Sequence, residues 1–238
     1  IQVAEQMCDY LCNGGISNSL NAPSMSGEEA PILKPWIQLV NVLGSFAGQV
    51  TESAIKEIEI EYVGAVAKLN LTPLTAGLVA ELLRPLIGDN GIVNIVSAPL
   101  IARERGIKIS EIMKDAQGAF GSYVRLRLFT ETKIRSVAGT LYSDGKPRFI
   151  QIKGINMESE PQKYMIYTTN TDLPGYIGAL GTELGKYQVN IATFSLGRDK
   201  RSGEAIALLG LDEPVTDIVL EKIRALPQVL QAKSLTFN

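Results

Sequence analysis

The hydrophobic and polar positions of the chain repeat with two different periods, and the change of period predicts its organisation. Up to about residue 120, apolar residues mostly recur every three or four positions, which is typical of amphipathic helices. This spacing predicts helices at 1–13, 31–50, 72–88 and 99–105, and a short helical turn at 110–115. From residue 123 alternate residues are apolar, which predicts strands at 123–129, 134–142 and 148–152.

An earlier strand is predicted at 56–62, where polar and apolar residues alternate strictly. Its acidic positions are Glu57, Glu59 and Glu61, and its apolar positions are Ile58, Ile60 and Tyr62. Successive side chains of a strand point to opposite faces, so the pattern predicts one buried face and one face in water. A calcium site along the acidic row is the less favoured alternative, because no loop supplies the remaining oxygen ligands.

Two local signals describe the helices around this strand. Residues 44–48 are small apart from Phe46, and small residues let a second helix approach closely. Thr72 is expected to cap the next helix, with Pro73 in the first turn.

Polar stretches rich in turn residues separate three parts of the chain. They occupy 18–29 and 156–162. After the second, we expect strands at 164–169, 189–196, 205–211 and 229–237 and helices at 174–187 and 214–225, with Ile177 and Ile218 facing the core. The order β-α-β-β-α-β is that of a ferredoxin-like fold. The predicted class is therefore α+β: a mixed α/β domain followed by a ferredoxin-like domain.

Composition narrows the possible chemistry. The 238 residues include no histidine, so catalysis by a Ser-His or Cys-His pair and metal binding through imidazole are excluded. With 23 basic and 25 acidic residues the net charge is −2, which argues against general nucleic-acid binding. The absence of a long apolar run argues against a membrane span, and no signal peptide is visible. The missing initiator methionine suggests the downstream part of a longer cytoplasmic protein.

The two cysteines, Cys8 and Cys12, are too few for a disulfide framework or a thiolate zinc site within one chain. Their spacing places them on one face of the first helix, and we expect both to be half-buried core side chains. No P-loop, paired catalytic carboxylates or metal-ligand cluster is visible. Gly178, Gly181 and Gly185 lie within a predicted helix and lack the spacing of a dinucleotide-binding loop.

The turn at 170–175 is the best candidate binding site. Asp172 can accept hydrogen bonds from an ammonium group, and the following helix start can hold a carboxylate. Asn190 begins the next strand and is expected at the same end of the sheet. The alternative, favoured on spacing alone, is that Asp172 caps the helix and Asn190 fills a turn.

A group of basic residues in the middle of the chain is the second candidate. Its members are Arg125, Arg127, Lys133, Arg135, Lys146, Arg148 and Lys153. Arginine and lysine on neighbouring strands can hold a phosphate or carboxylate, although an ordinary solvated face is the favoured alternative.

Residues 170–175 and 188–192 resemble an ACT domain, a small amino-acid-sensing module. More broadly, the chain resembles the C-terminal half of long-form D-3-phosphoglycerate dehydrogenases. This resemblance is carried by residues 3–7, 17–23, 29–31, 43–48, 98–107 and 139–142. It implies that 1–26 is the tail of a catalytic module, 27–160 an intervening, allosteric substrate-binding domain, and 161–238 the ACT domain.

The resemblance also implies functional residues. An L-serine effector site would comprise Asn170, Asp172, Leu173, Pro174, Gly175 and Asn190, although some family members carry histidine at the position of Asn170. An anion site for phosphate or 3-phosphoglycerate would comprise Arg135, Arg148 and Lys153. We expect no catalytic residue, metal site or cofactor in this chain, with NAD bound by the full-length parent.

The implied assembly is a homo-oligomer joined through ACT domains, with no nucleic-acid or membrane partner. Two alternatives stay open. One is the regulatory part of an iron–sulfur L-serine dehydratase, and the other is a free-standing amino-acid sensor.

Overall fold

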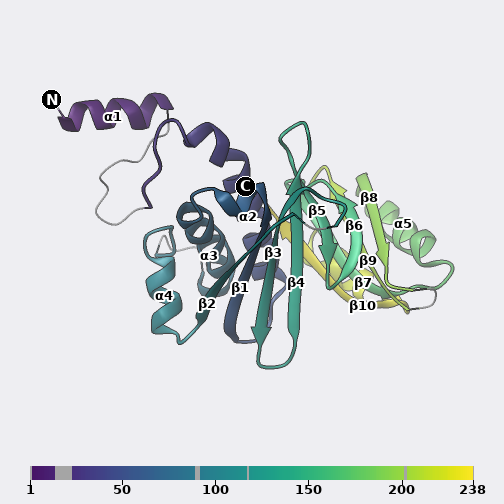
Figure 1. Ribbon diagram of the computed structural model, residues 1–238. Coiled ribbons are helices and arrows are strands. Elements are labelled where there is room, and N and C mark those ends of the chain that lie inside the picture. The colour runs from purple at the N-terminus through teal and green to yellow at the C-terminus, as the bar shows by residue number, and fades with distance from the viewer. Residues whose placement is uncertain (1, 14–22, 89–91, 117, 201–202, 238) are drawn as a thin grey trace. The chain divides into compact units, whose positions relative to one another are not determined.

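The computed structural model describes residues 2–13, 23–88, 92–116, 118–200 and 203–237 (Figure 1). The chain divides into two compact units, Ile1–Pro147 and Arg148–Asn238. The structure is mixed α/β with two sheets, as the predicted fold class requires. The domain ranges 27–160 and 161–238 stay a prediction. The compact units are defined by contacts within the folded chain, whereas these domain ranges come from the family resemblance.

A sheet in the order β2-β1-β3-β4 forms the centre of the first unit. Strand β1 (Ile55–Gly64) pairs in parallel with β2 (Lys108–Lys114) and antiparallel with β3 (Ser122–Thr130). Strand β4 (Ile134–Leu141) continues the antiparallel ladder from β3.

The predicted helical turn at 110–115 is wrong, because these residues belong mainly to strand β2. The apolar residues Ile109, Ile112 and Met113 have the spacing of a helix. Pairing with β1 overrides that local preference, since every residue from Lys108 to Lys114 has a partner position on β1.

Helices α2 (Ala30–Val50) and α3 (Thr72–Ile87) lie over one face of this sheet (Figure 1). The predicted close approach is confirmed: a Cβ atom on Gly44 would lie 2.3 Å from the Leu78 carbonyl oxygen, and one on Gly48 would lie 2.4 Å from that of Leu82. Beneath the helices, the apolar residues of β1 are fully buried.

The expected cap of α3 is wrong. Thr72 is the first helical residue, the capping position belongs to Leu71, and no side chain caps the helix. Pro73 lies in the first turn as predicted. The remaining helical segments of this unit are η1 (Ala65–Lys68) and α4 (Ala98–Glu104).

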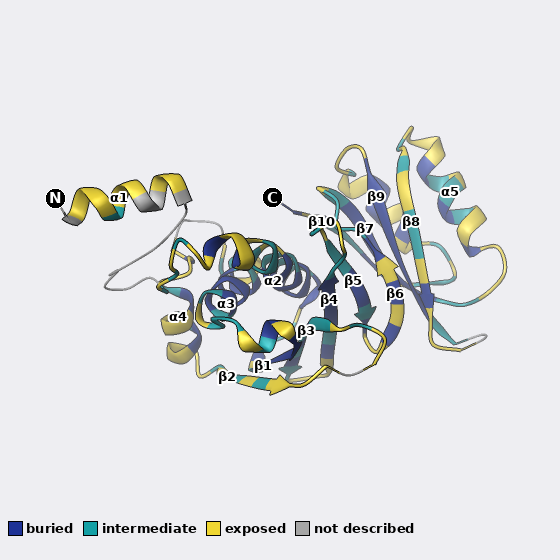
Figure 2. Ribbon diagram, turned by 45° about the horizontal axis from the view of Figure 1, so that its top comes forward, coloured by how far each residue is buried: buried dark blue, intermediate teal, exposed yellow. Residues whose placement is uncertain are grey.

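Helix α1 (Gln2–Asn13) remains exposed along most of its length (Figure 2). Cys8 and Cys12 are exposed, so the expectation that they are half-buried is wrong. The spacing places them on one helix face, but burial requires a packing partner that a sequence pattern does not supply. Among the described residues, no helix is long and apolar enough to cross a membrane.

The second unit contains the predicted β-α-β-β-α-β order. Its elements are β7 (Tyr164–Thr171), α5 (Tyr176–Lys186), β8 (Ile191–Arg198), β9 (Glu204–Leu211), α6 (Asp217–Arg224) and β10 (Val229–Thr236). The sheet order is β10-β7-β9-β8, and β9 runs antiparallel to both β7 and β8. A hairpin of β5 (Pro147–Ile152) and β6 (Ile155–Ser159) precedes this sheet.

Side chains of the sheet and of both helices form the core of the second unit, among them Ile166, Leu180 and Ile223. Ile177 and Ile218 were expected in this core, but they are 54% and 65% exposed. A helix lying on a sheet buries only a stripe of its surface, and these two residues fall at the edge of that stripe.

Candidate functional site

The candidate turn follows directly on β7. Asn170 lies on this strand with its side chain only 1% exposed, and its Nδ2 donates to the Thr171 carbonyl over 3.1 Å. Its buried Oδ1 has no hydrogen-bond partner in the described structure. An unpaired buried acceptor costs roughly 1–3 kcal/mol, so this atom is well suited to receive a donor from a ligand.

Asp172 holds the turn through its backbone and keeps its carboxylate near the surface. Its N–H donates to the Gly203 carbonyl over 2.9 Å, and Oδ2 accepts a long contact of 3.5 Å from Arg198. No side chain caps α5, so the alternative in which Asp172 caps this helix is wrong. The carboxylate therefore remains available to a positively charged ligand group.

The rest of the turn shapes the entry to α5. Leu173 is 47% exposed, and Pro174 precedes Gly175, whose φ of +91° is a conformation that L residues rarely adopt. Helix α5 then begins at Tyr176. The unsatisfied amides at its first turn give this end of the unit a partial positive charge.

Asn190 lies at the opposite end of the sheet, so the expectation that it shares an end with Asp172 is wrong. Strand β8 runs parallel to β7, since both are antiparallel to β9, and it starts beside Leu211 while β7 ends beside Glu204. The crossover through α5 returns the chain to the end where β7 began. An eight-residue strand spans about 23 Å, which separates the two positions within one chain.

A pocket of about 390 Å³ surrounds Asn190, and its lining includes Tyr187, Asp212, Glu213 and Val219. Asn190 Nδ2 donates to Asp212 Oδ2 over 2.7 Å. Sequence reasoning missed the two acidic residues because they follow β9, far from the ACT-like motif in the chain.

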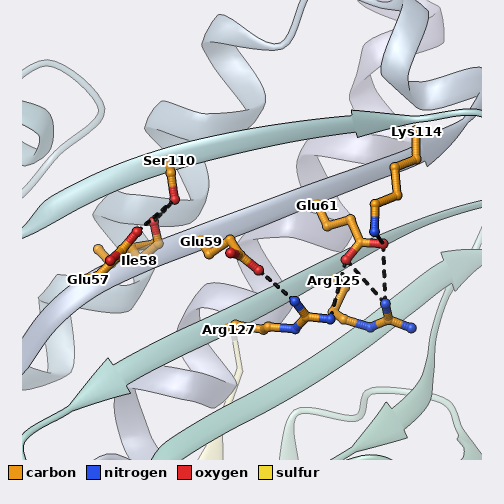
Figure 3. Close-up of polar contacts among 8 residues, drawn as sticks. All are labelled: Glu57, Ile58, Glu59, Glu61, Ser110, Lys114, Arg125 and Arg127. Carbon is orange, nitrogen blue, oxygen red and sulfur yellow. Dashed lines mark hydrogen bonds and ion pairs between the residues drawn. The ribbon is translucent and has the colours of Figure 1, made fainter.

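The strand pattern predicted that the acidic face of β1 lies in water, and this prediction is wrong. Glu59 pairs with Arg127 over 2.8 Å, and Glu61 pairs with Lys114 and Arg125 over 3.2 Å each (Figure 3). Opposite charges stand on neighbouring strands, so they neutralise one another and Glu61 is only 2% exposed.

The pKa of Glu61 reflects two opposing effects. Burial raises the pKa of Glu61. The hydrogen bond from Lys114 and the charge of Arg125 lower it by a larger amount, so the net pKa lies below its usual value. The Arg125 and Arg127 side chains therefore stabilise the sheet, because they form ion pairs with the carboxylates of β1.

The three residues expected to hold an anion have different surroundings. Arg148 pairs with Glu160 over 2.9 Å, and Lys153 pairs with Glu204. Arg135, in the other unit, is 7% exposed, and its Nε and Nη2 atoms are buried without a hydrogen-bond partner in the described structure. The three-residue anion site stays a prediction.

Comparison with known proteins shows the family. The family model for the D-3-phosphoglycerate dehydrogenase intervening domain matches residues 32–153, slightly more than half of the chain. The chain belongs to the D-3-phosphoglycerate dehydrogenase intervening-domain family.

Curated relatives extend this similarity over nearly the whole chain. It is 28% identical over 232 residues to a D-3-phosphoglycerate dehydrogenase of Bacillus subtilis, covering 98% of this chain and 44% of the relative. Identity to the enzyme of Methanocaldococcus jannaschii is 30%, covering 95% of this chain and 43% of the relative. Identity to the Synechocystis enzyme is 30%, covering 94% of this chain and 40% of the relative. The chain therefore spans less than half the length of these dehydrogenases.

The intervening-domain match includes the paired acidic and basic face, Arg135, Arg148 and Lys153. It ends before Asn170, Asp172 and Asn190, so it does not bear on the effector-binding role expected of these three residues. Among the described residues of this D-3-phosphoglycerate dehydrogenase relative, no cluster of three or more His, Cys, Asp or Glu side chains is placed to hold a metal ion.

Proposed function

We propose that this chain is the regulatory part of an NAD-dependent D-3-phosphoglycerate dehydrogenase, which catalyses the first step of L-serine biosynthesis. Membership of the intervening-domain family and the D-3-phosphoglycerate dehydrogenase relatives support this assignment. In this proposal NAD binds elsewhere in the parent protein. In this proposal the chain itself performs no catalysis, and it has no histidine to accept the substrate's hydroxyl proton as the hydride passes to NAD.

L-Serine binds where two copies of the ferredoxin-like unit meet. The observation that supports this proposal is the placement of Asp172 and Asn190 at opposite ends of one sheet. Strand β8 is the last strand of that sheet. If two β8 strands pair antiparallel about a two-fold axis, the Asn190 end of one copy lies beside the Asp172 end of the other.

Each polar group of serine then has a partner of suitable chemistry. The ammonium meets the carboxylate of Asp172, the hydroxyl donates to the unpaired Oδ1 of Asn170, and the carboxylate lies at the start of α5. Asn190 and Asp212 of the second copy close the site from the other side. Serine bound at this seam favours one arrangement of subunits, which is a coupling free energy available for feedback inhibition.

The intervening domain is further proposed to bind an anion, phosphate or 3-phosphoglycerate, through Arg135, Arg148 and Lys153. The unpaired Nε and Nη2 of Arg135 support this role, since these two atoms form the edge of a guanidinium that holds an oxyanion in a bidentate manner. Arg148 and Lys153 would first have to exchange the carboxylates they now contact.

Calorimetry with L-serine tests the effector site. We expect saturable binding by the unchanged chain and at least tenfold weaker binding by Asp172→Ala, while Asp115→Ala, which removes an exposed acid in the other unit, binds normally. No binding at millimolar L-serine, or unchanged binding by Asp172→Ala, contradicts the site. A coding sequence that starts at the beginning of this chain would favour the free-standing sensor instead.

A further inference from the structure

A row of three residues crosses the second sheet beside the candidate turn. Ala205 on β9 is in register with Asn170 on β7 and with Arg198 on β8. Residues in register across an antiparallel sheet point to the same face, so these three side chains lie on one side of it. This side faces α5, because Thr168, two residues before Asn170, shares a hydrogen bond of 2.5 Å with the Tyr176 hydroxyl.

Arg198 reaches along this row to the candidate turn. Its Nη1 donates to Asp172 Oδ2 over 3.5 Å, although the whole of strand β9 lies between β8 and β7. The β9 residue between them is Ala205, whose side chain is a single methyl group and leaves room for the guanidinium to pass. Folding therefore adds a cation to the turn from a strand that follows it in the chain.

The contact between Arg198 and Asp172 is weak enough to be exchanged. It is long for a hydrogen bond, and the Arg198 side chain is 63% exposed. Solvent screens such a pair, so it contributes little to stability. A ligand ammonium can therefore replace the guanidinium at Asp172, which frees the guanidinium for an anionic group of the same ligand.

We propose that Arg198 binds the carboxylate of the amino-acid effector and makes the site select a zwitterion. This role rests on the proposed L-serine site at residues 170–175. The ligand ammonium takes the carboxylate of Asp172, and the ligand carboxylate lies between Arg198 and the start of α5. The planar guanidinium offers paired N–H donors that match the two oxygens of a carboxylate.

The exchange explains why a ligand with both charges is preferred. One anion and one cation of the protein meet one cation and one anion of the ligand, so no charge is left without a partner. An amine that lacks the carboxylate displaces Arg198 from Asp172 and leaves two positive groups side by side. Specificity then comes from this repulsion as well as from the ion pair that the amine cannot form.

The test compares L-serine with ethanolamine, which keeps the ammonium and the hydroxyl but lacks the carboxylate. Calorimetry on the 238-residue chain is expected to show L-serine binding roughly tenfold or more tightly than ethanolamine. Arg198→Met should weaken L-serine binding by roughly tenfold and leave ethanolamine binding unchanged or tighter, because Asp172 loses its competitor. Arg198→Lys keeps the charge without the paired donors and should retain part of the preference.

Lys222→Met is the matched control, because it removes one exposed positive charge from α6 in the same unit. It should preserve both affinities. The same ratio of affinities in Arg198→Met as in the unchanged chain would overturn this role for Arg198 and leave the serine site standing. Weaker self-association in sedimentation, with no change in that ratio, would overturn it too and assign Arg198 to the contact between copies. Absence of L-serine binding by the unchanged chain would contradict the serine site and the role of Arg198 together.

Discussion

Glu61 remains charged within the first sheet because cations approach it from both neighbouring strands. Lys114 on β2 and Arg125 and Arg127 on β3 lie within 3.6 Å of its carboxylate. Their combined effect outweighs burial, and the pKa of Glu61 falls below its ordinary value of 4.5. A lowered folded-state pKa contributes stability above the unfolded-state pKa, and this contribution is lost as the pH falls through the folded-state value.

Replacing this carboxylate should therefore reduce stability at neutral pH. We expect Glu61→Gln to lower the free energy of unfolding by about 2 kcal/mol at pH 7, because it removes the buried charged acceptor that Lys114 and Arg125 share. The difference from the unchanged chain should shrink below pH 4.5 as Glu61 becomes protonated. Urea unfolding at the two pH values measures both effects.

Glu57→Gln is the matched control for this prediction. Glu57 lies on the same strand face and pairs with the exposed Lys108, whose hydrogen bond lowers the pKa of Glu57. An exposed pair contributes little to stability because solvent screens it, so a small loss is expected. Equal losses of unfolding free energy in the two variants would show that the burial of Glu61 does not increase its contribution to stability.

At the scale of secondary-structure elements, helices α2 and α3 pack with their backbones in close contact. Gly44 faces the backbone of α3 so closely that an added Cβ atom would overlap the Leu78 carbonyl. The small residues of 44–48 predicted this contact, because only glycine lets two helix backbones approach so near. The two helices then cover the apolar face of β1 and complete the core of the first unit.

Gly44→Ala should separate these helices and destabilise the chain by about 2 kcal/mol, since the overlap outweighs the better helix propensity of alanine. Gly178→Ala is the control, because it lies in helix α5 with no atom within 4 Å of the added Cβ. Here alanine should stabilise by about 0.5–1 kcal/mol. Thermal unfolding followed by circular dichroism measures both, and a neutral Gly44→Ala would contradict the close contact.

At the scale of the whole molecule, the proposed serine site depends on assembly. One copy of the second unit separates the expected serine-binding residues by the length of its sheet, and β8, the last strand in the order of that sheet, runs between them. Leu196 on this strand is 40% exposed and is not needed to complete the core of its own unit. These features favour association along β8 over binding within one chain.

Leu196→Lys should raise the dissociation constant of the two-fold assembly by roughly tenfold or more, because it places two like charges at the seam. Leu230→Lys is the control, since Leu230 is 65% exposed on β10, the opposite edge of the same sheet. Sedimentation equilibrium with and without L-serine compares the variants. If both variants weaken the assembly equally, or if neither weakens it, the interface lies elsewhere.

The sequence by itself determined the features that depend on neighbours along the chain. The order β-α-β-β-α-β, the strand at β1 and the close contact at Gly44 all follow from periodicity, turn residues and side-chain size. The resemblance identified the family, which the match to residues 32–153 confirmed. In the candidate site, the turn at 170–175 was visible because its proline and glycine define a backbone shape locally.

The tertiary structure decided what depends on distant partners. Residues 110–115 became a strand because β1 lies beside them, and Glu61 became buried because arginines of β3 neutralise it. The position of Asn190 at the other end of the sheet, by contrast, was already implied by the predicted β-α-β order, because the crossover helix returns the chain to the end where β7 began. Burial and charge pairing are properties of segments brought together by folding, so only the folded chain reveals them.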